Sequence, residues 1–331
     1  MPRRRASTTS NITSSPLVIE PPSYRNIVNI SLETNPDLLQ RLQPIADSNN
    51  TALLAFIAPS LGKKVSPVDF LTASIGILEE LGIEEAVREI KKATNGNINK
   101  LYLLIESPGG LVDSSYKIAR HLRYKFSEII SFVPHIAASG GTLMAISADK
   151  LVMGDMASLT PIDVQIPYGS TMVSVNRMNS ALATLIKFFE TKLPEQVPYP
   201  YRAMVDKLDP IIYDDWNSKT NAMIEYVADL LSKVGYQPKD MVSILQNLIL
   251  TNKPHNFVVH KDIARDWGIK IASDGEYINE LNCMKWWLNN YMLSAGAEHY
   301  IRYVIPQTQA HVDPVISSSV ITNTEITKES V

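Results

Sequence analysis

Cysteine is almost absent from this chain, with one residue, Cys283, among 331. A single thiol excludes an internal disulfide framework and any zinc site built from several cysteines. With only 14 glycines and 20 prolines, the chain is neither collagen-like nor a flexible linker. The net charge of −3 gives no overall attraction to nucleic acid or to an anionic membrane. The remaining balance, 45% hydrophobic and 20% charged residues, is that of a globular protein with one large domain or two ordinary ones.

Both ends of the chain are polar. Residues 1–15 contain three arginines and a Ser/Thr run, but no apolar segment of the kind that a secretory signal has. The last 25 residues are also rich in Ser and Thr and poor in large apolar side chains. We therefore expect disordered tails at residues 1–27 and 306–331, one folded domain over 28–305, and a cytoplasmic protein.

One internal segment, residues 129–148, has no charged side chain and is long enough to cross a bilayer. Pro134, His135 and two glycines near its centre argue against a membrane helix. A strand at 129–133, a glycine-rich turn and a buried helix explain the segment better, so we expect no insertion into a membrane.

Apolar runs of strand length alternate with helical spacing in the first half of the chain. The expected strands are 52–58, 100–105, 129–133 and 150–153, and the expected helices are 68–95, 112–125 and 139–148. The connections between these strands are too long for hairpins, which indicates a parallel sheet with crossover helices.

After Pro167 the pattern becomes mainly helical. Helices are expected at 176–192, 218–234, 238–250, 261–267 and 276–293, with short strands at 257–259 and 269–272. The aromatic, proline-rich stretch from Tyr199 to Trp216 is expected to be a packed loop, with a lid or an oligomer contact as the alternative.

Two Gly-Gly pairs follow expected strands, at Gly109-Gly110 and Gly140-Gly141, each where the chain turns into a helix. The first turn of a helix leaves N–H groups unpaired, and glycine lets a ligand approach them closely. Two such turns side by side would supply two donors to one oxyanion. Ser139, just before the second pair, would present its hydroxyl from a strand-to-helix elbow. Tight turns with glycines for close packing are the alternative, and neither pair fits a phosphate-binding motif.

Four segments resemble known peptidases. Residues 105–112 (IESPGGLV) are similar to the SPGG segment of Clp-type peptidases, and residues 138–141 (ASGG) to their nucleophile segment, which signal-peptide peptidases share. Residues 157–165 and 253–269 resemble a narrower group, the serine dehydrogenase proteinase family. The resemblance implies the α/β fold of the Clp/crotonase superfamily, a spiral of ββα units with a mainly parallel sheet, plus a helical C-terminal part.

By the same resemblance, Ser139 would be the nucleophile, and the N–H groups of Gly110 and Gly140 would form the oxyanion hole. It also implies a homo-oligomer, a peptide or unfolded protein as substrate, and an unfoldase as a further partner. No cofactor or metal is implied.

A serine nucleophile needs a base, and here the chain departs from the Clp pattern. Clp peptidases have their histidine on the strand after the nucleophile's helix, where this chain has Asp163. Near the expected position of the acid, the chain has His255. Because a triad depends on geometry and not on chain order, a triad of Ser139, His255 and Asp163 is our interpretation.

Other residues are weaker candidates. Lys187 would be the base of a Ser–Lys peptidase, but its helical position lies opposite the apolar face, which indicates a solvated side chain. His135 is interpreted as structural, and Cys283 as a buried thiol in an amphipathic helix and not a nucleophile.

These residues favour a serine endopeptidase that forms an acyl-Ser139 intermediate. One alternative is a crotonase-like acyl-thioester enzyme, which would use the same oxyanion hole without a nucleophile. The other is a non-catalytic assembly subunit with a vestigial site, which the missing histidine at 159–165 keeps open.

Overall fold

The computed structural model describes residues 28–32, 36–57, 75–168, 171–205, 209–250, 253–294 and 299–307. The tail expected at residues 1–27 lies outside this part of the chain, as do residues 308–331, the loop expected at 59–66 and the start of the helix expected from 68.

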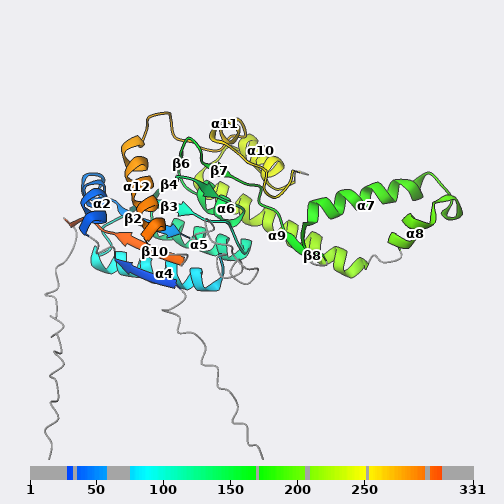
Figure 1. Cartoon of the computed structure of the whole chain (residues 1–331), viewed down its shortest axis with the longest axis horizontal. Coiled ribbons are helices and arrows are strands. Elements are labelled where there is room, and N and C mark those ends of the chain that lie inside the picture. The colour runs from blue at the N-terminus through cyan, green and yellow to red at the C-terminus, as the bar shows by residue number, and fades with distance from the viewer. Residues whose placement is uncertain are drawn as a thin grey trace, which may run out of the picture.

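A six-stranded sheet forms the centre of the protein, in the order β1–β10–β2–β3–β4–β6 (Figure 1). Its strands are Val28–Leu32 (β1), His299–Val304 (β10), Ala52–Ile57 (β2), Lys100–Glu106 (β3), Glu128–Val133 (β4) and Lys150–Met153 (β6). The strands from β2 to β6 in this order run parallel, whereas β10 is antiparallel to β2 and parallel to β1. The expected α/β fold with a mainly parallel sheet is therefore confirmed.

Helices cover both faces of the sheet and give three layers (Figure 1). One face carries α4 (Ile77–Ala93), α5 (Val112–Lys125) and α6 (Gly140–Ile146). The other face carries α2 (Pro36–Asn49) and α12 (Ile278–Ser294). The first glycine-rich turn follows the end of β3. The second follows β5 (Ile136–Ala137), the short strand after β4 that leads into α6.

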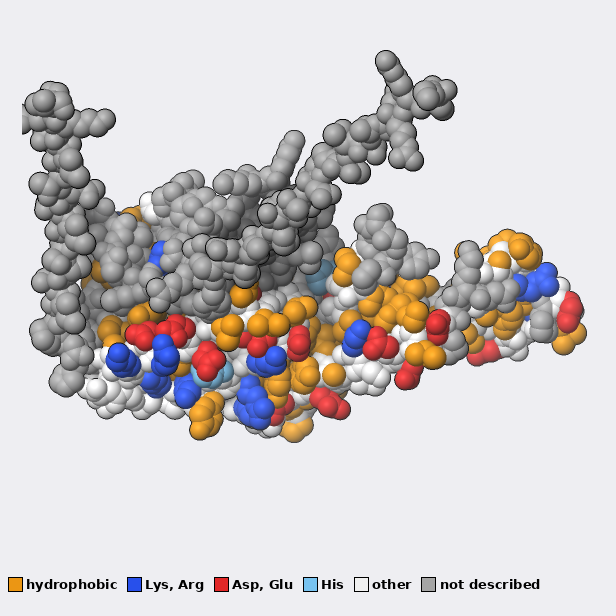
Figure 2. Space-filling view, turned by 90° about the horizontal axis from the view of Figure 1, so that it is seen from below, with side chains coloured by type: hydrophobic (Ala, Val, Ile, Leu, Met, Phe, Trp, Pro, Cys, Tyr) orange, Lys and Arg blue, Asp and Glu red, His pale blue; other side chains and the backbone are white. Residues whose placement is uncertain are grey.

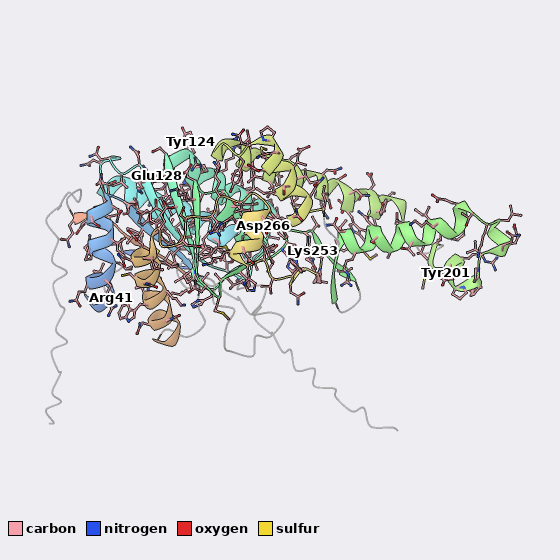
Figure 3. The ribbon with its side chains drawn as sticks, turned by 90° about the horizontal axis from the view of Figure 1, so that it is seen from above. Arg41, Tyr124, Glu128, Tyr201, Lys253 and Asp266 are labelled. Atoms are coloured by element: carbon pink, nitrogen blue, oxygen red, sulfur yellow. The ribbon has the colours of Figure 1, made fainter. Side chains whose placement is uncertain are left out.

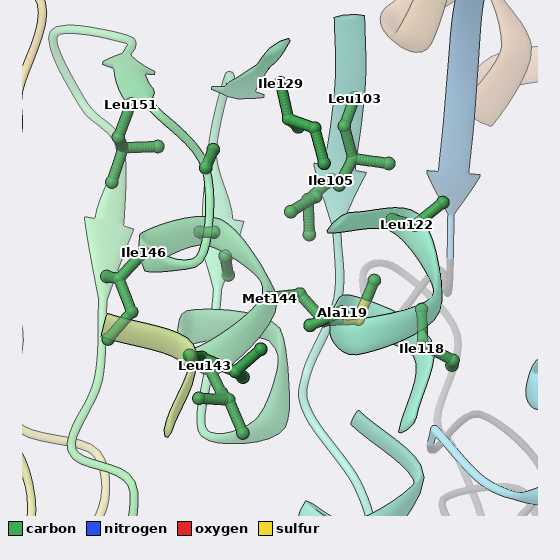
Figure 4. Packing of buried hydrophobic residues seen from close by; sticks show 14 of the residues in the cluster. Leu103, Ile105, Ile118, Ala119, Leu122, Ile129, Leu143, Met144, Ile146 and Leu151 are labelled. Atoms are coloured by element: carbon green, nitrogen blue, oxygen red, sulfur yellow. The ribbon is translucent and has the colours of Figure 1, made fainter. Parts of the chain in front are cut away.

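Successive side chains of a strand point to opposite faces, so β3 contributes to two cores. Leu103 lies in the first core, and its neighbours Tyr102 and Leu104 lie in the second. Figure 4 shows the first core, where side chains of α5 and α6 such as Ile118 and Met144 pack against the strands. Each large side chain buried in this way contributes about 1.5–3 kcal/mol to folding.

The second half of the chain is mainly helical, as expected, and part of it forms an arm (Figure 1). A small hairpin of β8 (Gln165–Tyr168) and β9 (Thr171–Ser174) leads into α7 (Val175–Glu190). The arm consists of α7, α8 (Tyr199–Val205) and the first part of α9 (Pro210–Val234). The later turns of α9 rejoin the first core, followed by α10 (Pro238–Leu248) and α11 (Lys261–Asp266).

The sequence predicts a packed loop from Tyr199 to Trp216, and this prediction is wrong. Most of its described residues are helical, and α9 already begins at Pro210 because Asp209 accepts a hydrogen bond from the Ile211 N–H at 2.9 Å. Figures 1 and 3 both place α8, with Tyr201, at the far end of the arm. The arm therefore holds this stretch away from the body, which does not fit a lid.

Two other expectations differ in detail. Within the described residues, the helix expected from residue 68 begins only at Ile77, because the backbone of Ile75 pairs with Gly109 and Leu111. The short strands expected at 257–259 and 269–272 are reduced to single bridges, one to Leu159 and one to Leu151.

The uncharged run at 129–148 folds as expected into a strand, a glycine-rich turn and a buried helix. In the parts of the chain that the structure describes, no helix combines the length and apolar character that a bilayer span requires.

Candidate active site

Ser139 lies between β5 (Ile136–Ala137) and the first residue of α6. Its backbone has φ +48°, a left-handed conformation that costs a residue other than glycine about 1–3 kcal/mol and persists only where the surroundings hold it. The side chain is almost buried. This is the strained strand-to-helix elbow that the sequence predicts.

Two threonines hold the elbow. The Ser139 N–H donates a hydrogen bond to Thr160 Oγ1 at 3.0 Å. Thr142 Oγ1 lies 2.7 Å from the carbonyl oxygen of Ala137 and accepts the N–H of Thr160 at 3.2 Å. Both threonine side chains are buried, so these bonds are shielded from water. The elbow is thereby joined to the segment after β7 (Ser158–Leu159), which also carries Asp163.

The two glycine-rich turns lie side by side. The Ser107 N–H donates to the Ile136 carbonyl at 3.0 Å, and the Ala138 N–H donates to the Ser107 carbonyl at 2.9 Å. A methyl group added at Gly109 would lie 2.8 Å from Ser139 Cβ, so only glycine fits against the elbow. The turns that sequence reasoning pairs are therefore paired in space.

Gly110 and Gly140 border the same space. A methyl group added at Gly140 would lie 3.5 Å from Gly110 N. Within the described residues, no acceptor for the Gly110 N–H is found, and the Gly140 N–H belongs to the first turn of α6, where a helix provides none. The two turns that meet at Ser139 thus each contain an N–H group with no acceptor in the described structure.

His255 and Asp163 are in contact, although 92 residues separate them in the sequence. The ring Nδ1 of His255 lies at hydrogen-bond distance from Asp163 Oδ1, and the other carboxylate oxygen of Asp163 accepts from Gln165 Nε2 at 2.8 Å. Two backbone hydrogen bonds of 3.0 Å between Leu159 and Val259 bring the two segments together.

The burial of this pair is unequal. The Asp163 side chain is 4% exposed and that of His255 is 38% exposed. Since Nδ1 is engaged by the carboxylate, Nε2 is the ring nitrogen that remains for another partner. Within the part of the chain that the structure describes, His255 and Ser139 Oγ share no direct hydrogen bond. Such contacts are often long in free enzymes and shorten when substrate binds.

The other candidates are placed elsewhere. Lys187 is exposed on the arm, on the same side as Ser180 and Thr184, as the helical spacing predicts. Figure 3 shows the arm extending away from the segment of Lys253, two residues before His255. Cys283 is half-buried in α12, and burial raises the pKa of its thiol, which disfavours the nucleophilic thiolate. In the described ranges, no group of His, Cys, Asp and Glu side chains has the arrangement of a metal site.

Sequence comparison identifies the family. A profile of the ClpP-like SDH-type serine proteinases matches residues 70–309, well over half of the chain. The chain belongs to this ClpP-like SDH-type serine proteinase family. The matched range includes every residue that the sequence analysis assigns to the site.

Two relatives of this family member come from Methanocaldococcus jannaschii. The uncharacterized protein MJ0137 is 42% identical over 83 residues, which cover 25% of this chain and 28% of that protein. The uncharacterized protein MJ1495 is 30% identical over 112 residues, 32% of this chain and 38% of that protein. The alignments therefore span less than two fifths of either relative.

Solved structures similar to this SDH-type proteinase include a mutant of the 1510-N membrane-bound stomatin-specific protease. It has a TM-score of 0.40 and 16% identity, over 63% of this chain and 78% of that one. The 1510-N membrane protease specific for a stomatin homolog from Pyrococcus horikoshii has a TM-score of 0.34 and 14% identity, over 61% and 72% of the two chains.

Sequence reasoning misses the groups that support the site. Thr142, Thr160 and Gln165 receive no role from the sequence, although the last two lie in the family-like segment 157–165, because their roles depend on which segments meet in space. Glu106, the last residue of β3, is also unexpected: its buried carboxylate lies 3.5 Å from Nδ1 of His135. A charged residue at the end of an otherwise apolar strand was the available signal for Glu106.

Proposed function

We propose that this SDH-type proteinase is a serine endopeptidase that hydrolyses peptide bonds through an acyl-Ser139 intermediate. The observation that carries the proposal is the contact between His255 and Asp163, on a segment that is also bonded to the strained elbow of Ser139. Asp163 lies only three residues after Thr160, which binds the backbone of Ser139, so both parts of the site share one support. The substrate would be a peptide or an unfolded protein segment.

In this mechanism, Ser139 Oγ attacks the carbonyl carbon of the scissile bond while its proton passes to His255 Nε2. Asp163 accepts the Nδ1–H of His255 and stabilises the imidazolium that forms. The electron pair of the broken carbonyl π bond moves to oxygen, where the N–H groups of Gly110 and Gly140 would bind it. His255 then gives the proton to the leaving amine as the C–N bond breaks. A water molecule hydrolyses the acyl-enzyme by the same steps.

The exchanged order of acid and base does not oppose this assignment. Asp163 is buried and engaged on both carboxylate oxygens, whereas His255 is partly exposed and keeps one ring nitrogen open. Burial and orientation are what the acid of a triad requires, and access is what the base requires.

The test is hydrolysis of an unstructured protein, such as fluorescently labelled casein, by the full chain. The Ser139→Ala variant should lose activity by a factor of about 1000 or more, since loss of the nucleophile costs about 10⁶ in kcat in a serine protease with a Ser-His-Asp triad. Ser131→Ala is the matched control, because Ser131 is a buried serine on β4 whose Oγ has no hydrogen-bond partner in the described structure. Equal activity of both variants would refute the proposal.

The crotonase-like alternative predicts a different outcome. An acyl-thioester enzyme with this oxyanion hole needs no serine nucleophile, so Ser139→Ala would keep most activity on an acyl-thioester and the wild type would not cleave casein. No specific observation in the site favours that reaction over peptide hydrolysis.

A further inference from the structure

Glu106 and His135 form a second carboxylate–imidazole pair, beside the two glycine-rich turns. Glu106 Oε2 lies 3.5 Å from His135 Nδ1 and accepts a hydrogen bond from the Ile136 N–H at 3.4 Å. The Glu106 side chain is 1% exposed. Its other oxygen, Oε1, is buried and has no hydrogen-bond partner in the described part of the chain.

The pair lies where both turns begin. Glu106 ends β3 and directly precedes the turn with Gly109 and Gly110. His135 directly precedes β5, which leads into Ser139 and Gly140. The backbone bonds between Ser107 and Ile136 and between Ser107 and Ala138 start one residue after Glu106 and His135. The pair therefore joins the segment that leads to Gly110 to the segment that leads to Gly140, just before the two turns begin.

A buried carboxylate is costly unless an opposite charge or several hydrogen bonds compensate it. Here Oε2 accepts only the long bond from the Ile136 N–H and lies 3.5 Å from His135 Nδ1, and both Oε1 and His135 Nδ1 lack a hydrogen-bond partner in the described structure. A buried carboxylate with so few hydrogen bonds needs a specific structural or catalytic explanation. A neutral side chain of the same size would be better for stability alone.

Resting on the peptidase function proposed above, we propose that Glu106 and His135 are positioning residues of the oxyanion hole. The contacts of the Glu106 carboxylate with the Ile136 N–H and the His135 ring fix the distance between the turn of Gly110 and the turn of Gly140. An error of about 1 Å in such positioning costs on the order of 100-fold in rate. The negative oxygen develops only as the bond to Ser139 forms. Loss of the correct spacing between the two N–H groups should therefore slow the chemical step and leave ground-state binding unchanged.

The test is the kinetics of Ser139 modification by a fluorophosphonate, which separates reagent binding (KI) from the bond-forming step (kinact). In that step Ser139 Oγ bonds to phosphorus, fluoride leaves, and the serine proton passes to the base. Glu106→Gln and His135→Gln should each lower kinact by about 10- to 100-fold with KI unchanged. The Glu106→Gln/His135→Gln variant should be no slower than the slower single variant, since the two residues act as one unit.

Asp149→Asn is the matched control. Asp149 accepts the Ile129 N–H at 2.7 Å and pairs with Arg123, so it makes the same kinds of contact at the opposite end of β4. Its loss should lower thermal stability and leave kinact unchanged. A wild-type kinact in folded Glu106→Gln, or additive effects in the double variant, would overturn the positioning role. Failure of the wild type itself to react would instead refute the proposed function, and this inference with it.

Discussion

Ser139 has a backbone conformation that is unfavourable for serine, and its neighbours show what holds it. The Ser139 N–H is bonded to Thr160, and Gly109 packs against its Cβ. No residue other than glycine fits at 109 or 110, because an added methyl group would overlap the elbow or the backbone of Ile75. At the residue scale, the site is therefore defined by close backbone approach as much as by reactive side chains.

Substitution at Gly110 tests that approach. In Gly110→Ala the new methyl group overlaps N and O of Ile75, which must move and shift the turn, so the N–H of residue 110 no longer points into the site. The value of kcat should fall by about 100-fold or more, comparable to the loss of one oxyanion donor. Steady-state kinetics on a peptide substrate would measure this.

Gly96→Ala is its control, since Gly96 also has a positive φ (+74°) but has open space around it. This variant should lose about 1 kcal/mol of stability and keep its kcat. If Gly110→Ala kept the kcat of the wild type while folded, the N–H of residue 110 would not be an oxyanion donor.

A second prediction at this scale separates the two candidate bases. His255→Ala should lower kcat by at least 1000-fold, because the group that contacts Asp163 and takes the serine proton is lost. Lys187→Met should be nearly normal, because Lys187 is exposed on the arm. The reverse result, measured on one peptide substrate, would place the chain with the Ser–Lys peptidases.

At the scale of elements, the site is assembled from segments that the sequence separates widely. β7 and the residues that follow it bond to the elbow through Thr160 and pair with the His255 segment through Leu159 and Val259. This stretch is the one that connects Ser139, Asp163 and His255. A disturbance of this segment should therefore affect catalysis before it affects the fold.

Thr160→Val tests this connection. Valine keeps the volume but removes the oxygen that accepts the Ser139 N–H, so the elbow loses a buried hydrogen bond. We expect kcat to fall by about 10-fold or more, the equivalent of roughly 1–3 kcal/mol for a buried unsatisfied N–H. Thr220→Val removes a comparable buried hydroxyl that bonds to Trp216 in α9, and it should leave kcat unchanged. An equal effect of both would show general destabilisation.

Local sequence patterns predict many of these elements, but they do not predict which distant segments pair with one another. The strands at 100–105 and 150–153 and the helix at 112–125 follow from apolar runs and 3.6-residue spacing and agree with the structure within a residue. The pairing of β10 with β1 and β2 is not expected from the sequence, because it joins the two ends of the domain and depends on contacts across more than 200 residues.

The candidate site shows the same division. Ser139, Gly110 and Gly140 are found from the sequence because turn glycines and an elbow serine are local signals. The contact of His255 with Asp163 is predicted only as a pairing of residue types, and neither the bond of Gln165 to Asp163 nor the bond of Thr160 to Ser139 is predicted. The contact of His255 with Asp163 depends on a single bridge between Leu159 and Val259, and the short strand expected at 257–259 does not specify its partner.

At the scale of the whole molecule, the arm is the least covered part of the described structure. No residue of α8 is buried, and Tyr199 and Ile211 are 72% and 80% exposed. Other large apolar side chains exposed on the arm are Ile186, Leu193, Met204 and Ile212. Figure 2 shows hydrophobic side chains spread along it. Contiguous exposed apolar surface of this kind is typical of a contact site.

We propose that a second copy of the chain covers the arm, consistent with the homo-oligomer that the resemblance implies. A Tyr199→Asp/Ile211→Asp variant should then have a lower molar mass by light scattering after size exclusion, because two charges would be buried in the contact. Tyr124→Asp, at an exposed position on the body, should keep the mass of the wild type. A wild-type protein that is monomeric at every concentration would contradict the proposal.

Covalent labelling tests most directly whether Ser139 is the acylated nucleophile. The full chain is treated with a fluorophosphonate, digested, and analysed by mass spectrometry. One adduct is expected, on the peptide that contains Ser139, and it should be absent from Ser139→Ala and strongly reduced in His255→Ala. No adduct on the folded wild type, or an adduct on another residue that persists in Ser139→Ala, would contradict it.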